Sequence, residues 1–219
     1  MKYRKDTPLY YTNYYGLIIY KSSDKILSSE ELSPNDNSMH GFTSEGFYQL
    51  EKIVLTKDIK KVEWNGLGRY RFKKFEVALD NPVFQEIDGI LYTRKGHDRY
   101  GITRRTKMIE LVACPTDVTT HHVMQGTIRI ANCAFKGSRV SNLFIPDSVE
   151  EIGTNAFYFA DNLKTIEIPL SLKKLEPQIS RTPLIIRYRG KEFDSWNNLF
   201  VYLLDNGFEY KFNKIVKGK

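Results

Sequence analysis

Cysteine is scarce in this chain, because its 219 residues contain only two, Cys114 and Cys133. A small secreted fold held by disulfides needs a dense set of cysteines, so that class is excluded. We expect both cysteines to be small, semi-buried side chains without a disulfide, as in a reduced intracellular protein.

Long apolar runs are also missing. No stretch near the first residues is long enough for a secretory signal peptide, and no window approaches a membrane span. We therefore predict a cytoplasmic protein, or one at the cell surface if a leader has been removed. The hydrophobic fraction of 41% and the aromatic fraction of 13% still suffice for a continuous core, which argues against disorder.

The usual sequence patterns of catalysis are absent as well. There is no G-x-S-x-G nucleophile elbow. The glycines at 66 and 68 lack the Lys-Ser/Thr pair and the helix of a phosphate-binding loop, so we interpret them as a turn. The adjacent acids Glu150 and Glu151, like Glu30 and Glu31, occupy polar positions and are interpreted as solvated. We predict that the chain is not an enzyme and binds no cofactor.

His121 and His122 are candidate metal ligands, because both cysteines, which can also bind a metal, lie within the same part of the chain. Adjacent residues on an extended strand point to opposite faces, so only one of the two histidines could join a cluster. The spacing between these histidines and the cysteines also matches none of the usual zinc patterns. We predict no metal and interpret both histidines as polar loop residues.

One thirteen-residue phrase occurs three times, with apolar residues at the same five offsets. It reads LEKIVLTKDIKKV at 50–62, VSNLFIPDSVEEI at 140–152 and LKTIEIPLSLKKL at 163–175. Val123, Ile145 and Ile168 are equivalent positions, and the interval between them is almost constant. Self-similarity at such a fixed period predicts a stacked repeat architecture.

Each repeat has a physical interpretation. Residues 163–168 alternate apolar and polar near their end, which is typical of a strand, and Pro169 then removes a backbone donor and stops the ladder. Phe135 and Phe157, which lie one repeat apart, should stack inside the molecule. One unit cannot bury its apolar edge alone, so stacked neighbours should form a parallel sheet with short turns or helical turns between strands.

The residues IGTNAF, IPDSVEEI, NPVF…DGILY, VACP and YRG…SW resemble the BspA-like, surface-antigen-type leucine-rich repeat proteins, over most of the chain. The resemblance implies a right-handed, leucine-rich-repeat-like solenoid of the α/β class, mostly β, used for adhesion or protein binding rather than catalysis.

The whole chain is predicted to be one structural domain of about five to seven coils. Residues 1–49 should form an N-terminal cap with short strands and a loop. Residues 50–183 should form the solenoid, with a β-hairpin insertion at 81–118 whose strands lie near 90–93 and 108–113. Residues 184–219 should form a C-terminal cap, with a strand at 184–190 and a helix at 195–208.

The exposed positions of the sheet are candidates for binding a protein partner, because solenoids offer extended surfaces. Their charge is mixed, which suits a protein better than a nucleic-acid backbone, and Phe144 could serve as an aromatic anchor. The candidate residues are Lys52, Val54, Lys74, Glu76, Asn142, Phe144, Thr165 and Glu167.

A basic segment at 69–107 offers the main alternative to protein binding through the sheet, which is binding to nucleic acid. It holds ten basic and five acidic residues, in a chain whose formal charge is +7, with tyrosines interleaved. Such a segment could contact nucleic acid or an acidic protein, or it could be a solvated hairpin tip. The candidate residues for anion contact are Arg69, Arg71, Arg94, Lys95, Arg99, Arg104, Arg105 and Lys107.

Overall fold

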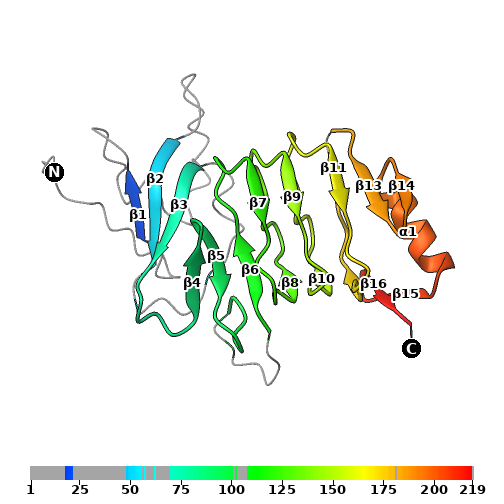
Figure 1. Ribbon diagram of the computed structural model, residues 1–219, viewed down its shortest axis with the longest axis horizontal. Coiled ribbons are helices and arrows are strands. Elements are labelled where there is room, and N and C mark those ends of the chain that lie inside the picture. Colours follow the sequence, from blue (N-terminus) through cyan, green and yellow to red (C-terminus); the bar gives the residue numbers. More distant parts are fainter. Residues whose placement is uncertain are drawn as a thin grey trace, which may run out of the picture.

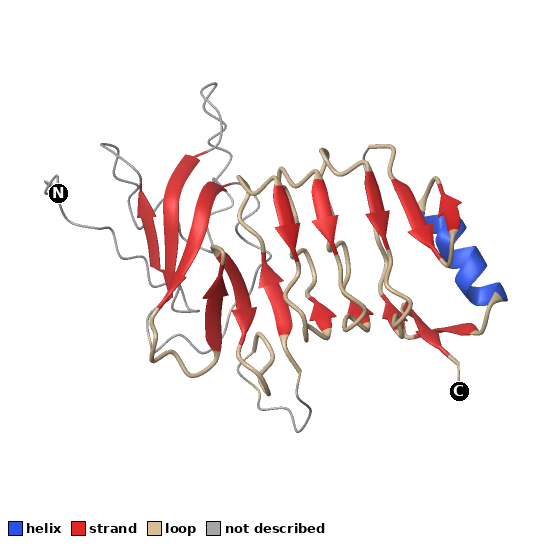
Figure 2. Cartoon of the chain, viewed as in Figure 1, coloured by secondary structure: helices blue, strands red, loops and turns tan. Residues whose placement is uncertain are grey.

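The computed structural model describes residues 18–21, 48–55, 57, 62, 70–100, 102, 108–180 and 182–218, and all structural statements concern these residues. They form an elongated stack, with β1 (Ile18–Lys21) at one end and α1 (Trp196–Asp205) at the other (Figure 1). Among them α1 is the single helix, and the rest is strand and turn (Figure 2). The predicted fold class is confirmed, since this is a mostly β solenoid of about five turns.

The first sheet shows the repeat period directly. β2 (Tyr48–Leu55) pairs antiparallel with β1 and parallel with β3 (Tyr70–Val77). In the parallel pair Ile53 lies opposite Phe75, and Leu55 lies opposite Val77. Both Ile53 and Phe75 are buried. A separation of one repeat along the chain therefore brings equivalent apolar side chains into register, as the sequence predicts.

One row of strands forms an eight-stranded sheet in the order β15-β16-β12-β10-β8-β6-β5-β4. Its members are β4 (Phe84–Ile87), β5 (Ile90–Thr93), β6 (Glu110–Ala113), β8 (Arg129–Ile130), β10 (Glu151–Ile152), β12 (Lys174–Leu175), β15 (Phe208–Lys211) and β16 (Lys214–Lys217). β6, β8, β10 and β12 pair in parallel, as expected for successive coils. The antiparallel pairs are confined to the two ends of the sheet.

The insertion continues this sheet. β5 and β6, close to the two predicted strands, pair antiparallel, and β6 then pairs in parallel with β8 of the solenoid. β4, which the sequence analysis missed, joins β5 through a tight turn at Asp88 and Gly89, both with positive φ. Asp-Gly favours this kind of hairpin turn. A side chain at Gly89 would also meet the Lys74 Cβ at 2.9 Å.

A second row of short strands runs beside the first from the middle of the stack to its C-terminal end (Figure 1). It contains β7 (Thr120–His122), β9 (Asn142–Phe144), β11 (Thr165–Glu167), β13 (Ile185–Tyr188) and β14 (Lys191–Phe193). β7 pairs in parallel with β9, β9 contacts β11, and β11 pairs in parallel with β13. β14 closes this row by pairing antiparallel with β13.

Stacked aromatic rings fill the interior between the rows. The Phe135 and Phe157 centroids lie 5.7 Å apart, which confirms the predicted aromatic stack. The stack is longer than predicted, because Phe157 also lies parallel to Trp196 at 5.9 Å, and Phe135 contacts His121 at 6.5 Å. Aromatic contacts at these separations add to the stability gained from burial alone.

The C-terminal cap is built on α1, within the predicted range 195–208. Ser195 caps its N-terminus, because its Oγ accepts a hydrogen bond from the Asn198 amide at 3.2 Å. Trp196, Leu199 and Leu203 form the buried face of the helix. The β15–β16 hairpin that follows was not predicted, and β16 pairs with β12 at the open end of the eight-stranded sheet.

Candidate protein-binding face

Strand alternation turns two side chains outward on each of β9 and β11. Asn142 and Phe144 flank the buried Leu143, and Thr165 and Glu167 flank the buried Ile166. The side chains of Asn142, Phe144 and Glu167 are exposed, and Thr165 is half-buried. The structure therefore places these four candidate residues together on one outward face of the second row of strands, as period-two alternation requires.

An aromatic pair marks this face. The rings of His122 on β7 and Phe144 on β9 stack with their centroids 4.2 Å apart and their planes 12° apart. The register places the two residues directly opposite each other, and Phe144 remains 54% exposed. Sequence reasoning assigned His122 to a loop and missed this contact, although the separation of one repeat between His122 and Phe144 could have revealed it.

The other four candidates of the predicted face lie in a different sheet. Lys52 and Val54 on β2 pair with Lys74 and Glu76 on β3. Lys52 and Val54 are half-buried, and the Lys52 ammonium lies 2.6 Å from a Glu76 carboxylate oxygen. The β1-β2-β3 sheet shares no strand pairing with the β7–β9 sheet among the described residues. The eight candidate residues, which were predicted to share the exposed positions of one sheet, are thus divided between two sheets.

Two arginines of the basic segment are used inside the fold. Arg94 donates hydrogen bonds to the carbonyl oxygens of Asn81, at 2.8 Å, and Leu79, at 3.0 Å. Arg99 is buried, with hydrogen bonds to the Asn132 carbonyl at 3.4 Å and the Tyr100 hydroxyl at 2.8 Å. These contacts leave the two guanidinium groups fewer free N–H donors with which to bind the phosphates of a nucleic acid.

The rest of the basic segment is only partly described. The Lys95 side chain is exposed. Arg71 lies on β3, but its side chain is outside the described residues. Arg69, Arg104, Arg105 and Lys107 lie outside the described residues altogether. Contact between these residues and an anion therefore stays a prediction.

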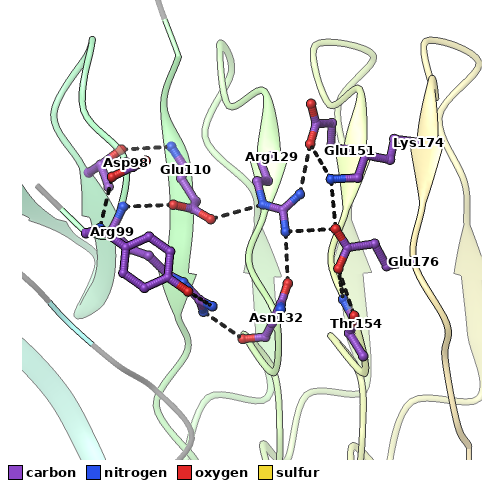
Figure 3. Close-up of polar contacts among 11 residues, drawn as sticks. Asp98, Arg99, Glu110, Arg129, Asn132, Glu151, Thr154, Lys174 and Glu176 are labelled. Atoms are coloured by element: carbon purple, nitrogen blue, oxygen red, sulfur yellow. Dashed lines mark hydrogen bonds and ion pairs between the residues drawn. The ribbon is translucent and has the colours of Figure 1, made fainter. Parts of the chain in front are cut away.

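A charge ladder crosses the eight-stranded sheet (Figure 3). Glu110, Arg129, Glu151 and Lys174 lie opposite one another on β6, β8, β10 and β12. The Arg129 guanidinium reaches Glu110 at 3.1 Å, Glu151 at 2.8 Å and Glu176 at 3.3 Å. Charges of opposite sign on directly opposing strands stabilise the pairing of successive coils.

The pKa values of two carboxyl groups in this cluster, Glu110 and Glu176, are shifted in opposite directions. Burial raises the pKa of Glu110, although the charge of Arg129 opposes this. Burial alone would also raise the pKa of Glu176, but hydrogen bonds from Lys174 and Thr154 and the charge of Arg129 lower it to about 2. Opposed shifts of this kind occur in acid–base catalysts. Here the partners of both carboxylates belong to the fold itself, so we assign the ladder a structural role.

The ladder corrects the interpretation of Glu151 as a solvated residue, whereas Glu150 forms an exposed ion pair outside the ladder. Glu151 accepts hydrogen bonds from Arg129 and Lys174, and Glu150 lies 2.7 Å from the Lys173 ammonium. Both residues face basic side chains one coil away, because coils of nearly equal length align their polar positions. Glu30 and Glu31 lie outside the described residues.

His121 was predicted to be a polar loop residue, and this is wrong. It is the inward residue of β7, buried beside Tyr92, with 2.8 Å between the Tyr92 hydroxyl and the His121 Nε2. Burial lowers the pKa of His121 to about 4, which leaves a neutral ring at pH 7. The expectation that only one histidine faces inward holds, because His122 is exposed.

Both cysteines are free thiols. Cys114 is fully buried, more than the semi-buried position predicted for it, and Cys133 is half-buried. Burial raises the pKa of both thiols, so they remain protonated at neutral pH. Across the described part of the chain, no cluster of three or more His, Cys, Asp and Glu side chains is arranged to hold a metal ion.

The two stacked rows of strands define a leucine-rich-repeat-type solenoid, a class that presents extended binding surfaces and is generally non-enzymatic. The family model "BspA type Leucine rich repeat region (6 copies)" matches residues 114–180, which lie within the part of the chain that resembles this family. No curated protein matches the chain. No helix in the described ranges is long and apolar enough to cross a membrane.

Two solved structures are similar to this chain. The crystal structure of the pneumococcal vaccine antigen PcpA is 27% identical, with a TM-score of 0.46, and the match covers 57% of this chain and 29% of that one. A leucine-rich repeat protein from Eubacterium ventriosum is 15% identical, with a TM-score of 0.39, and the match covers 58% and 42%. This chain therefore spans less than half of either protein.

Proposed function

We propose that the chain is a non-enzymatic protein–protein interaction module that binds its partner through the exposed face of β7, β9, β11 and β13. The observation that supports this is the His122–Phe144 stack, which holds a large aromatic side chain in a fixed position while leaving it 54% exposed. Rigid aromatic residues at the centre of a face are the usual anchors of protein interfaces.

The surroundings of Phe144 fit this role. Asn142 and Thr165 offer polar groups that can form hydrogen bonds, and Glu167 adds one charge. A protein interface combines such a polar rim with a small apolar centre. The short strands below the face are fixed by buried residues such as Leu143 and Ile166, so little ordering entropy should be lost on binding.

The proposal is tested by immobilising the chain and capturing proteins from a lysate and a cell-surface fraction of the source organism, with and without nuclease. Phe144→Ser removes the anchor, and we expect it to weaken capture of a specific protein by about tenfold or more. Phe212→Ser is the matched control, because Phe212 is 93% exposed just after β15, outside the proposed face. A partner held equally by wild type and Phe144→Ser would refute the proposal.

The same experiment separates the alternatives. Material lost on nuclease treatment, with steep salt dependence and sensitivity to an Arg104→Glu/Arg105→Glu variant, would favour nucleic-acid binding through the basic segment. A partner recovered from the cell-surface fraction rather than the lysate would favour an adhesin-like role, since BspA-type repeats often occur in surface proteins.

A further inference from the structure

The C-terminal end of the proposed face contains a pocket. β13 and β14 continue the face beyond β11, and the register places Arg187 opposite Glu192. A pocket of about 340 Å³ lies beside these strands, lined by Ile185, Glu192, Phe193, Asp194 and Asn198. Ile185 is 43% exposed, so an apolar side chain lies open to solvent at this point.

The lining of the pocket is acidic and apolar. It includes two carboxylates and one amide, and none of the described residues that line it is basic. Asp194 accepts a hydrogen bond from the Asn198 Nδ2 at 2.6 Å, and Glu192 accepts one from the Arg187 Nε at 2.8 Å. A carboxylate can accept about four hydrogen bonds. Both side chains are exposed, so each retains oxygen lone pairs for a further donor.

This acidity contrasts with the chain as a whole, whose formal charge is +7. On the neighbouring strand β11, Glu167 is exposed and has no ion pair among the residues that the structure describes. Arg187, which lies opposite Glu167 in the sheet, is already paired with Glu192. The outward side of β11, β13 and β14 therefore carries the carboxylates of Glu167, Glu192 and Asp194 against the one guanidinium of Arg187, and such a surface complements a positively charged partner.

We propose that this end of the face binds a basic segment of the partner protein, with a lysine or arginine side chain of that segment in the pocket. The aliphatic stem would lie on Ile185 and Phe193, and the charged head would meet Glu192 and Asp194. Long basic side chains bury their stems in this way while the charged group stays at a polar rim. The inference rests on the proposed function, because it specifies the chemistry of the partner at the same face.

The test uses a short labelled peptide that alternates lysine and threonine, a matched peptide with glutamate in place of lysine, and a labelled single-stranded oligonucleotide. Fluorescence anisotropy measures their binding to the full chain. We expect the lysine peptide to bind and the glutamate peptide not to bind. The net positive charge of the chain would repel a lysine peptide, so binding would indicate a local acidic site.

Two double variants locate the site. In Glu192→Gln/Asp194→Asn the dissociation constant of the lysine peptide should rise roughly fivefold to tenfold, the range expected for two exposed ion pairs. Asp117→Asn/Asp205→Asn changes the net charge by the same amount at exposed positions outside the pocket and should leave binding unchanged. Far-UV circular dichroism and thermal melts of both variants check that these near-isosteric changes leave the fold intact.

Three results would overturn this inference: no binding of the lysine peptide, equal losses in the two double variants, or tighter binding of the glutamate peptide or the oligonucleotide. The capture experiment distinguishes this failure from failure of the proposed function. If Phe144→Ser loses the partner while Glu192→Gln/Asp194→Asn keeps it, the interaction face stands and the basic-segment proposal falls. If neither variant alters capture, both fall.

Discussion

Replacing Phe157 with Ala should remove the central ring of the interior aromatic stack. Phe157 is 5% exposed and lies between Phe135, at 5.7 Å, and Trp196, at 5.9 Å. Removing a buried phenyl ring costs roughly 3–5 kcal/mol, through lost transfer free energy and the cavity left behind. Because a domain of this kind is stabilised by about 5–15 kcal/mol, the variant should lose a large fraction of its stability.

The assay is urea unfolding followed by far-UV circular dichroism and by tryptophan fluorescence. Trp196 stacks directly on the deleted ring with only 4° between the planes, so its fluorescence should report the loss. Solenoids can unfold in parts, and the two probes together show whether the cap containing α1 separates from the rest.

The matched control is a variant that removes an exposed phenyl ring instead of a buried one. Phe212→Ala removes a phenyl ring that is 93% exposed, and we expect it to change stability by no more than about 0.5 kcal/mol. If Phe157→Ala lowers the free energy of unfolding by less than about 1 kcal/mol, the site must collapse around the missing ring. The reasoning that Phe157 stabilises the fold through its contacts with Phe135 and Trp196 would then be wrong.

Three further predictions concern single side chains. The folded pKa of His121, about 4, lies below the unfolded value of about 6.5, so its stabilising effect is complete above pH 6.5 and is lost as the pH falls towards 4. His121→Gln should flatten the measured stability curve in that window, and His122→Gln should not. Arg129→Met leaves the buried carboxylate of Glu110 without its main counter-charge, so urea unfolding should show a loss of about 3–5 kcal/mol, whereas a loss below about 1 kcal/mol would contradict the structural role of the ladder. Cys133 has a positive φ of 57°, a conformation that asparagine tolerates better, so Cys133→Asn should raise the melting temperature, and a lower one would contradict this account.

The repeat made much of the fold predictable. Equivalent apolar residues one repeat apart had to lie in register on neighbouring coils, because only stacking buries their shared edge. The Ile53–Phe75 and Phe135–Phe157 pairs follow from that spacing. Strand alternation likewise predicted that Phe144 points outward, because Leu143 between Asn142 and Phe144 belongs to the core.

Other features depended on contacts between segments that the repeat does not relate. Glu110 and Arg129 are separated by less than one repeat, so nothing in the sequence showed that they would be opposed in the sheet. The burial of His121 follows from the repeat, because it lies one repeat before the buried Leu143, but its hydrogen bond with Tyr92 of the insertion does not. The pocket at Ile185 and Asp194 needed the antiparallel return of β14 onto β13.

The sequence by itself determined that this protein is a stack of coils with aromatic side chains inside, because apolar periodicity is a local and repeated property of the chain. The tertiary structure decided which polar residues are paired, what the buried His121 contacts and where carboxylates gather on the exposed face. These outcomes arise from the insertion and the C-terminal cap, whose side chains approach the repeats from positions distant in the chain. Electrostatics and burial depend on those distances in space, which a repeat pattern does not encode.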